Sequence, residues 1–202
     1  MPASDQPSFA NMYATGFTPW DTGKPCPQLL EALKTGALSG HTVLEMGCGV
    51  GTNAIELARR GFKVTAVDYV PQAVDTSKTR AEKAGLLGDN LKIMLADLTE
   101  KPKLGGPFDI LFDRGVYHSI RTVNLPGFLE TLQTATKSGT RWLCMAGNSK
   151  EKHENGPPTV SEQEFRSELG GLFNILSAQE TVFDTNRPGF SPSAWVILME
   201  RK

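Results

Sequence analysis

A glycine-rich turn near residue 50 carries the clearest chemical signature in the chain. Residues 43–52 (VLEMGCGVGT) pass from an apolar run through three alternating glycines into a helical run. Because glycine has no side chain, a ligand can approach its backbone closely. Its backbone can also adopt conformations that a side chain would forbid. The dinucleotide fingerprint GxGxxG has two residues between its second and third glycines, whereas only Val50 separates Gly49 from Gly51. The spacing therefore disfavours a typical nicotinamide site.

Carboxylates accompany this turn at the ends of two predicted strands. Asp68 ends the second predicted strand, where a carboxylate can accept hydrogen bonds from both hydroxyls of an adenosine ribose. Asp97 follows the third predicted strand, near the expected edge of an adenine, and Glu45 precedes the glycines. Three acids without a neighbouring Lys or Arg would repel a pyrophosphate. We therefore expect a cationic, phosphate-free adenosine ligand.

The elements that must position these residues alternate between short apolar runs and amphipathic runs. The pattern predicts seven strands, over 41–46, 62–68, 91–96, 108–112, 141–146, 173–183 and 194–200. It predicts helices over 28–38, 52–60, 71–85, 126–137 and 161–169. We therefore expect an α/β fold with a mostly parallel sheet, helices on both faces and an antiparallel C-terminal strand. Ligand chemistry would collect at the carboxyl ends of strands one to four.

Composition limits the function classes. The 202 residues are 39% hydrophobic, which favours one globular domain. Lys and Arg number 21 against 22 Asp and Glu, so no global positive field exists to hold a nucleic acid. The opening residues resemble no signal peptide, and we expect no membrane-spanning run. The 3 cysteines suggest neither a disulfide framework nor a zinc site, which favours the cytoplasm.

The ordered motifs resemble those of the class I S-adenosylmethionine-dependent methyltransferases. The resemblance rests on the ExGxGxG turn at 45–51, the acids Asp68 and Asp97, and the strand at 108–113 (FDILFD), and it covers about residues 41–200. It implies a Rossmann-like fold and methyl transfer from S-adenosylmethionine, with S-adenosylhomocysteine as product and no metal. The implied cofactor-binding residues are Trp20, Glu45, Gly47, Gly49, Gly51, Asp68, Tyr69, Asp97, Leu98 and Asp113.

The resemblance also implies which part of the cofactor each of these residues would contact. The three glycines would border the methionine part, and Asp68 would bind the ribose hydroxyls. Asp97 and Leu98 would contact the adenine, and the backbone around Asp113 would contact the methionine amine.

A narrower resemblance comes from residues 19–25 (PWDTGKP). They look like the PWDxGxP segment of the thiopurine, thiol and halide methyltransferases and of related tellurite-resistance methyltransferases. The stretches 113–118 (DRGVYH) and 156–158 (GPP) look like the same branch. The resemblance implies that an N-terminal arm and helix, 1–40, cover the site, with Trp20 against the cofactor, while 41–202 form the core of a single domain, 1–202.

The acceptor side is expected to contain Tyr13, Phe17, Arg114 and His118. His118 follows the fourth predicted strand and is the candidate general base, although it could equally tie down the next helix. Asp113 could orient the substrate as a second catalytic residue, but a backbone role or a salt bridge with Arg114 is favoured. Tyr13, Phe17 and Trp20 could close an aromatic lid and attract the sulfonium.

We expect the acceptor to be a small molecule: a thiol, a halide, a metalloid or a small hydroxyl compound. A thiol ionises near pH 8.5 and needs little help, whereas an alcohol needs a positioned base. His153, in a charged loop, is a less favoured pocket residue. We expect a cytoplasmic monomer or homodimer without nucleic-acid or membrane partners. A macromolecule-directed methyltransferase, a nicotinamide-dependent oxidoreductase and an inactive cofactor-binding regulator stay open as alternatives.

Overall fold

A computed structural model describes residues 8–151 and 156–202 and is built around one mixed sheet. Its strands are β1 (Thr42–Met46), β2 (Lys63–Asp68), β3 (Leu91–Leu95), β4 (Phe108–Arg114), β5 (Thr136–Asn148), β6 (Thr159–Val160), β7 (Phe173–Val182) and β8 (Ser193–Arg201). They follow the order β3-β2-β1-β4-β5-β8-β7, and β6 adds to the sheet by pairing with β5. β8 runs antiparallel to both β5 and β7, whereas β1 to β5 are parallel.

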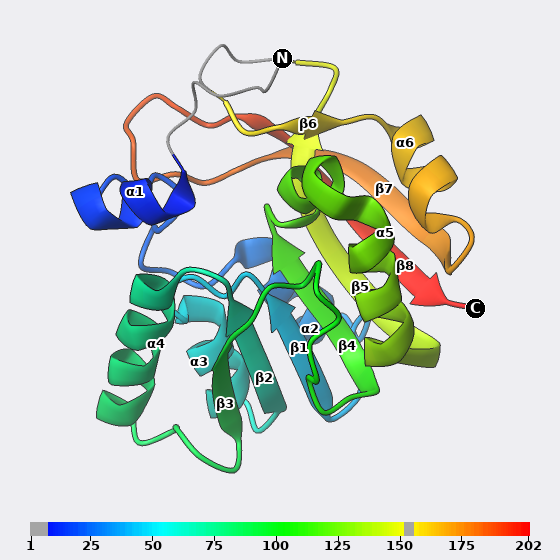
Figure 1. Cartoon of the computed structure of the whole chain (residues 1–202). Helices are drawn as coiled ribbons and strands as arrows, with labels where there is room; N and C mark the ends of the chain where they lie inside the picture. The colour runs from blue at the N-terminus through cyan, green and yellow to red at the C-terminus, as the bar shows by residue number, and fades with distance from the viewer. Residues whose placement is uncertain (1–7, 152–155) are drawn as a thin grey trace.

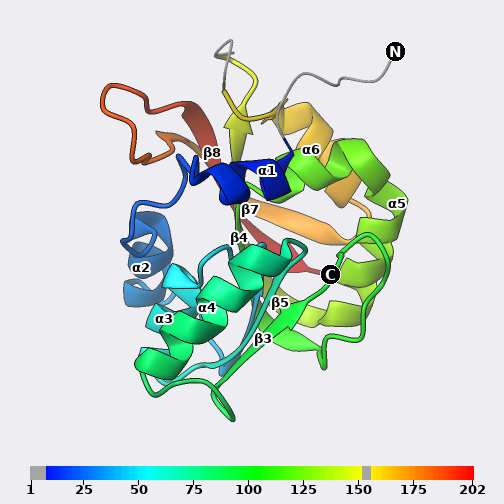
Figure 2. The same ribbon diagram turned by 60° about the vertical axis from the view of Figure 1, so that its left-hand side comes forward.

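Helices cover both faces of this sheet (Figures 1 and 2). They are α1 (Phe9–Thr15), α2 (Pro27–Lys34), α3 (Thr52–Arg59), α4 (Pro71–Lys83), α5 (Tyr117–Ala135) and α6 (Glu162–Leu169). Figure 2 shows α2, α3 and α4 on one side of the strands and α5 and α6 on the other. The predicted α/β class, the mostly parallel sheet and the antiparallel C-terminal strand are confirmed. No helix of the described residues is long and apolar enough to cross a membrane.

Two hydrophobic clusters pack on the two faces of the sheet. One joins α2, α3 and α4 to the strands, and the other joins α5 and α6. The central strand β1 contributes to both, because successive side chains of a strand point to opposite faces. Val43 belongs to the first cluster, whereas Leu44 and Met46 belong to the second. The end of β1, with its glycine turn, is therefore held from both sides.

Several elements differ from the sequence-based expectation, among them β5, which begins at Thr136 rather than at the predicted 141. The short α1 was not expected; Ser8 caps it by accepting the Asn11 N–H at 3.3 Å. The β6 strand has only 2 residues, too few to show an alternating pattern, so the sheet has eight strands rather than seven. α5 begins at Tyr117, well before the predicted start at 126.

The interruption within α5 explains why its first half was missed. Asn124 has non-helical angles (φ −154°, ψ 80°), and two helical segments meet there. Pro126 disfavours a helical conformation before it and lacks an N–H group. The Asn124 side chain accepts the Gly127 N–H at 3.1 Å and so begins the second segment, the part that periodicity predicts.

Asp109 anchors the start of β1 to the start of β4. Its Oδ2 accepts the backbone N–H groups of His41 (2.9 Å) and Thr42 (3.0 Å), and its Oδ1 lies 2.7 Å from the Lys137 ammonium. The Lys137 ammonium, followed by these N–H groups, holds the pKa of the Asp109 carboxyl well below its usual range. The ionised carboxylate therefore stabilises the folded chain.

We expect Asp109→Asn to lower the free energy of unfolding by roughly 1 kcal/mol at pH 7, the scale of lost charge-assisted hydrogen bonds. Because the folded-state pKa is depressed, this difference is complete above the unfolded pKa of about 4 and shrinks as the pH falls below it. Urea unfolding at pH 7 and pH 3 measures it, with Asp75→Asn on exposed α4 as control. An equal difference at both pH values would contradict the assignment.

Candidate active site

A cavity of about 770 Å³ opens at the carboxyl ends of β1, β2 and β4. Its walls come from the turns after these strands, from the start of α5, from the N-terminal arm and from the connection between β7 and β8. Figure 1 shows α1 and this connection on the same side of the sheet, beyond the strand ends. Segments far apart in sequence therefore meet around one space.

The glycine turn forms one wall, and each glycine has a positive φ: 63° at Gly47, 55° at Gly49 and 84° at Gly51. Gly47 and Gly49 line the cavity. A Cβ on Gly47 would lie 2.2 Å from Val116, so no side chain fits there. Gly51 is outside the lining; a Cβ there would lie 2.2 Å from Ser77 Oγ of α4. Gly51 therefore serves helix packing, and the structure does not bring it to the cavity as expected.

Asp68 joins the end of β2 to the glycine turn. Its Oδ2 accepts the Gly49 N–H at 2.8 Å, and its Oδ1 accepts the Val70 N–H at 2.9 Å. Burial raises the pKa of this carboxyl, and these backbone hydrogen bonds oppose the rise. Asp68 lines the cavity, and a carboxylate oxygen with one partner can accept another hydrogen bond. The carboxylate can therefore bind hydroxyl groups of a ligand.

Glu45 places an unpaired oxygen at the same wall. Its side chain is only 2% exposed and lines the cavity, and its Oε2 has no hydrogen-bond partner among the described residues. Burial raises the pKa of Glu45 to about 8, with Asn53 opposing and the charge of Asp68 adding. Buried polar atoms are normally paired. An unpaired carboxyl oxygen beside a cavity indicates a site for a hydrogen-bond donor or a cation.

The turn after β3 supplies the next part of the lining. Asp97 is exposed, and its Oδ1 accepts both the N–H (2.8 Å) and the hydroxyl (2.7 Å) of Thr99. Leu98 is buried beside it, and Tyr69 is half exposed at the end of β2. Asp97, Leu98 and Tyr69 all line the cavity, and the contact of Asp97 and Leu98 with an adenine stays a prediction.

Aromatic side chains of the N-terminal arm line the cavity, and the Tyr13 hydroxyl lies close to Gly49 of the glycine turn. Tyr13 and Trp20 stack edge to face at 5.8 Å, and the Trp20 Nε1–H donates to the Tyr13 hydroxyl at 3.3 Å. Phe17 is half exposed and also lines the cavity. Arg187, from the β7–β8 connection, lies 5.7 Å from the Phe17 ring centre. The arm therefore forms an aromatic wall.

Asn186 holds the arm in place, and it is a residue that the sequence pattern did not single out. Its backbone N–H donates to the Pro19 carbonyl at 2.9 Å. Its side-chain amide donates to the carbonyls of Thr18 (2.9 Å) and Asp21 (3.0 Å). The sequence around Asn186 indicated only a turn-rich segment. Its contacts with the arm could not be predicted because its partners are distant in sequence.

Arg114 is at the junction of β4, the arm and the β7–β8 connection. Its guanidinium donates to the backbone carbonyls of Trp20 and Asp184 and lies 5.2 Å from the Phe183 ring centre. Arg114 and Arg187 both line the cavity, so the expected lack of basic residues near the site does not hold for the cavity as a whole. Both face the arm and the β7–β8 connection.

The Asp113 side chain is a correction to the expected site. It is fully buried, and its Oδ1 accepts the N–H groups of Val116 (3.0 Å) and Tyr117 (3.1 Å). Its Oδ2 accepts the Trp142 Nε1–H at 2.9 Å. Asp113 is outside the cavity lining and does not pair with Arg114. Its carboxylate therefore anchors the start of α5, and direct catalysis by this side chain is not supported.

His118 lines the cavity, but its hydrogen bonding differs from that of a general base. Its Nδ1 accepts the Gly147 N–H at 2.8 Å, which ties α5 to β5 as the alternative interpretation expected. A backbone N–H only donates, so Nδ1 carries no proton and the neutral ring carries it on Nε2. Burial lowers the pKa of His118 to about 3, and a contact with the Gly115 backbone opposes this in part. His153 lies outside the described residues.

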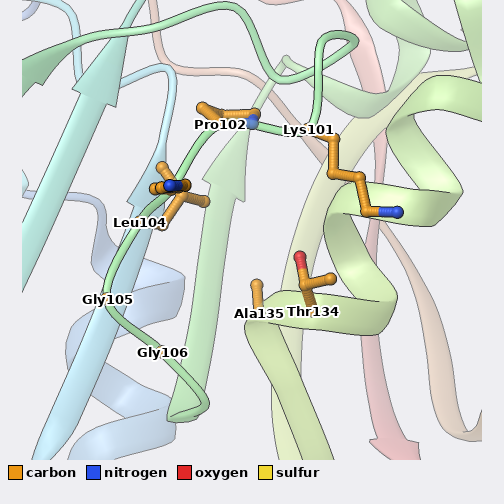
Figure 3. Close-up of a pocket in the computed structure, with 8 residues that line it drawn as sticks. Lys101, Pro102, Leu104, Gly105, Gly106, Thr134 and Ala135 are labelled. Atoms are coloured by element: carbon orange, nitrogen blue, oxygen red, sulfur yellow. The ribbon is translucent and has the colours of Figure 1, made fainter.

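A second cavity of about 440 Å³ lies between the β3–β4 connection and the end of α5 (Figure 3). Its lining consists of Lys101, Pro102, Lys103, Leu104, Gly105, Gly106, Thr134 and Ala135. Figure 3 shows Lys101 extending toward α5, where its Nζ lies 3.4 Å from Glu130. This lining has no carboxylate, histidine or cysteine. Within residues 8–151 and 156–202, no group of three or more such side chains could hold a metal ion.

The chain is similar in sequence to known methyltransferases. The family model of a methyltransferase domain matches residues 43–139. The chain is 26% identical over 174 residues to 2-heptyl-1-hydroxyquinolin-4(1H)-one methyltransferase of Mycobacteroides abscessus, over 85% of this chain and 75% of the relative. It is 24% identical over 163 residues to probable thiol methyltransferase 2 of Arabidopsis thaliana, over 78% and 69% of the two chains.

A solved structure has the same fold. It was described in connection with the conversion of a disulfide bond into a thioacetal group during echinomycin biosynthesis. Its TM-score is 0.81 at 23% identity, over 96% of this chain and 91% of the other. The family match identifies a methyltransferase domain at residues 43–139, and the relatives and the shared fold confirm the resemblance to the class I S-adenosylmethionine-dependent methyltransferases.

Proposed function

We propose that the chain transfers the methyl group of S-adenosylmethionine to a small molecule with a soft or acidic nucleophile. The observation that carries this proposal is the unpaired, buried Glu45 oxygen beside the glycine turn, in the cavity that Asp68 and Asp97 also line. The N-terminal arm adds aromatic side chains to the lining of this cavity. Relatives named for a thiol and for a hydroxyquinolone support a thiol, halide, metalloid or small hydroxyl acceptor.

The described residues fit such a cofactor. Asp68 would accept the ribose hydroxyls, and Asp97 and Leu98 would contact the adenine. Gly47 and Gly49 line the cavity, and their backbone would border the methionine part. The unpaired Glu45 oxygen would accept the methionine amine, because it is the buried acceptor without a partner at this wall.

The protein's part in the reaction is alignment and exclusion of water. When bound, S-adenosylmethionine supplies a methyl group that is already activated by a sulfonium. Holding the acceptor in line can account for roughly 7 to 11 kcal/mol of barrier lowering. Tyr13, Phe17 and Trp20 would cover the reacting groups, and their ring faces would attract a positive charge. A thiolate or halide acceptor needs no base in this arrangement.

We further propose that residues 1–202 act as one domain, with the arm at 1–40 covering the core at 41–202. The hydrogen bonds of Asn186 to the arm support this division. A cytoplasmic monomer or homodimer without nucleic-acid or membrane partners remains our expectation. The net charge of -1 and the apolar cavity favour a small acceptor over a macromolecule.

We expect Glu45→Gln to stabilise the ligand-free protein and to weaken S-adenosylhomocysteine binding by roughly tenfold or more, the scale of a hydrogen bond between charged groups. The folded-state pKa of Glu45 is raised, so this group costs stability as the pH rises from about 4 toward 8. Thermal unfolding at pH 7, with and without S-adenosylhomocysteine, measures both effects. Glu82→Gln on exposed α4 is the control; parent-like binding by Glu45→Gln would remove Glu45 from the site.

Incubation with labelled S-adenosylmethionine tests the acceptor class. We expect label to appear in a small acceptor from a panel of thiophenol, iodide, tellurite and a hydroxyquinolone, and not in added protein or RNA. Asp68→Ala is the matched inactive variant, because it removes the ribose contact and the link to the glycine turn. Label found only in protein or RNA would support the macromolecular alternative instead.

A further inference from the structure

We propose that His118 and Ser119 form a polar subsite that binds the methyl acceptor in its ionised form. The His118 Nε2–H group and the Ser119 hydroxyl donate hydrogen bonds to the negatively charged sulfur or oxygen of the acceptor. The acceptor class is a small acidic thiol or hydroxyl compound that enters the cavity as its anion. This inference rests on the proposed methyl transfer and specifies its acceptor.

The hydrogen bonds of His118 determine which nitrogen faces a ligand. Its Nδ1 accepts the Gly147 N–H at 2.8 Å. Gly147 pairs with Thr159 of β6 and Ala194 of β8, so the sheet holds that N–H in place. A neutral imidazole has one donor nitrogen and one acceptor nitrogen. Because Nδ1 is the acceptor, Nε2 is the donor, and His118 presents an N–H group rather than a base.

The space beside Nε2 is suited to a ligand atom. A Cβ on Gly115 would lie 3.5 Å from Nε2, an ordinary contact distance, so this nitrogen lies beside Gly115. Both residues line the cavity. The Gly115 backbone is a competing hydrogen-bond partner of the ring, which a bound anion would share or replace. Phe183 packs against His118 at 5.9 Å, and hydrogen bonds are stronger in such apolar surroundings.

Ser119 provides an independent observation at the same place. Its Oγ is buried and has no hydrogen-bond partner among the described residues, and Ser119 lines the cavity next to His118. A buried hydroxyl without a partner costs free energy. An anion in the cavity would satisfy this hydroxyl and the His118 N–H together.

Arg114 supplies positive charge near the subsite, and Asp184, which also lines the cavity, interacts with Arg114. Arg114 lies over the Phe183 ring that also contacts His118, and its hydrogen bonds go to backbone carbonyls rather than to a carboxylate. The Asp113 carboxylate is turned into the core toward Trp142. When the acceptor anion takes up the methyl group, it becomes neutral and the cofactor leaves as its neutral thioether. No proton passes to His118.

A dead-end complex tests the subsite without turnover. Thiophenol is titrated into the protein saturated with S-adenosylhomocysteine, and the ultraviolet absorbance of its thiolate reports the ionised fraction against pH. We expect thiophenol to bind as the thiolate, with its pKa lowered by about one unit or more, a tenfold preference for the anion. Binding as the neutral thiol, or no thiophenol binding at any pH, would overturn the proposal.

Substitutions at His118 and Ser119 test whether these side chains donate hydrogen bonds to the bound thiolate. We expect His118→Phe and Ser119→Ala each to weaken thiolate binding roughly tenfold to hundredfold, the range for a hydrogen bond to a charged group. His118→Gln keeps both an acceptor and a donor and should lose less. Thr122→Ala, exposed on α5, is the control. S-adenosylhomocysteine binding should be unchanged in all four.

The pH dependence of kcat/KM tests whether His118 acts as a general base. For the parent protein, we expect kcat/KM to rise with pH around the pKa of each aryl thiol used as acceptor. An acidic limb whose position is independent of the acceptor, and that His118→Gln abolishes, would make His118 a base and contradict the proposal. If the parent binds no S-adenosylhomocysteine, the proposed function itself fails, which is a different result.

Discussion

Two hydrogen bonds accepted by the Asp68 carboxylate hold the ligand-binding end of the sheet together. They connect the Gly49 N–H of the turn after β1 with the Val70 N–H of the turn after β2. Gly47, Gly49 and Gly51 can adopt their positive φ angles readily because they carry no side chains, and a turn so rich in glycine has little rigidity of its own. The carboxylate supplies that rigidity while keeping free lone pairs toward the cavity. Both the shape and the charge of the site depend on it.

Much of the fold could be predicted from local sequence patterns. The glycine turn could be predicted from its motif, and its three acids from their positions near the ends of predicted strands. β1, β2 and β3 lie within a residue or two of their predicted bounds, because buried parallel strands have short apolar runs with clear ends. The hydrogen-bond partners of Asp113 and His118, Trp142 and Gly147, could not be predicted because they are distant in sequence and come near only when β4, α5 and β5 assemble. No spacing rule reveals such a pairing.

The two halves of the cavity differ in their electrostatics. Glu45 and Asp68 keep carboxyl groups buried at the proposed cofactor side, where burial raises the pKa of both. Arg114 and His118 also line the cavity, at the proposed acceptor side. Buried polar groups of this kind cost stability unless a ligand pairs with them. The arrangement suits a positively charged donor facing a negatively charged acceptor, with a methyl group between them.

Isothermal titration calorimetry of the full chain with S-adenosylhomocysteine, and separately with NADH, tests the central claim most directly. The carboxylate-lined glycine turn predicts one-to-one binding of S-adenosylhomocysteine and no heat with NADH, whose pyrophosphate these acids repel. Binding of NADH, or no binding of S-adenosylhomocysteine, would contradict the account.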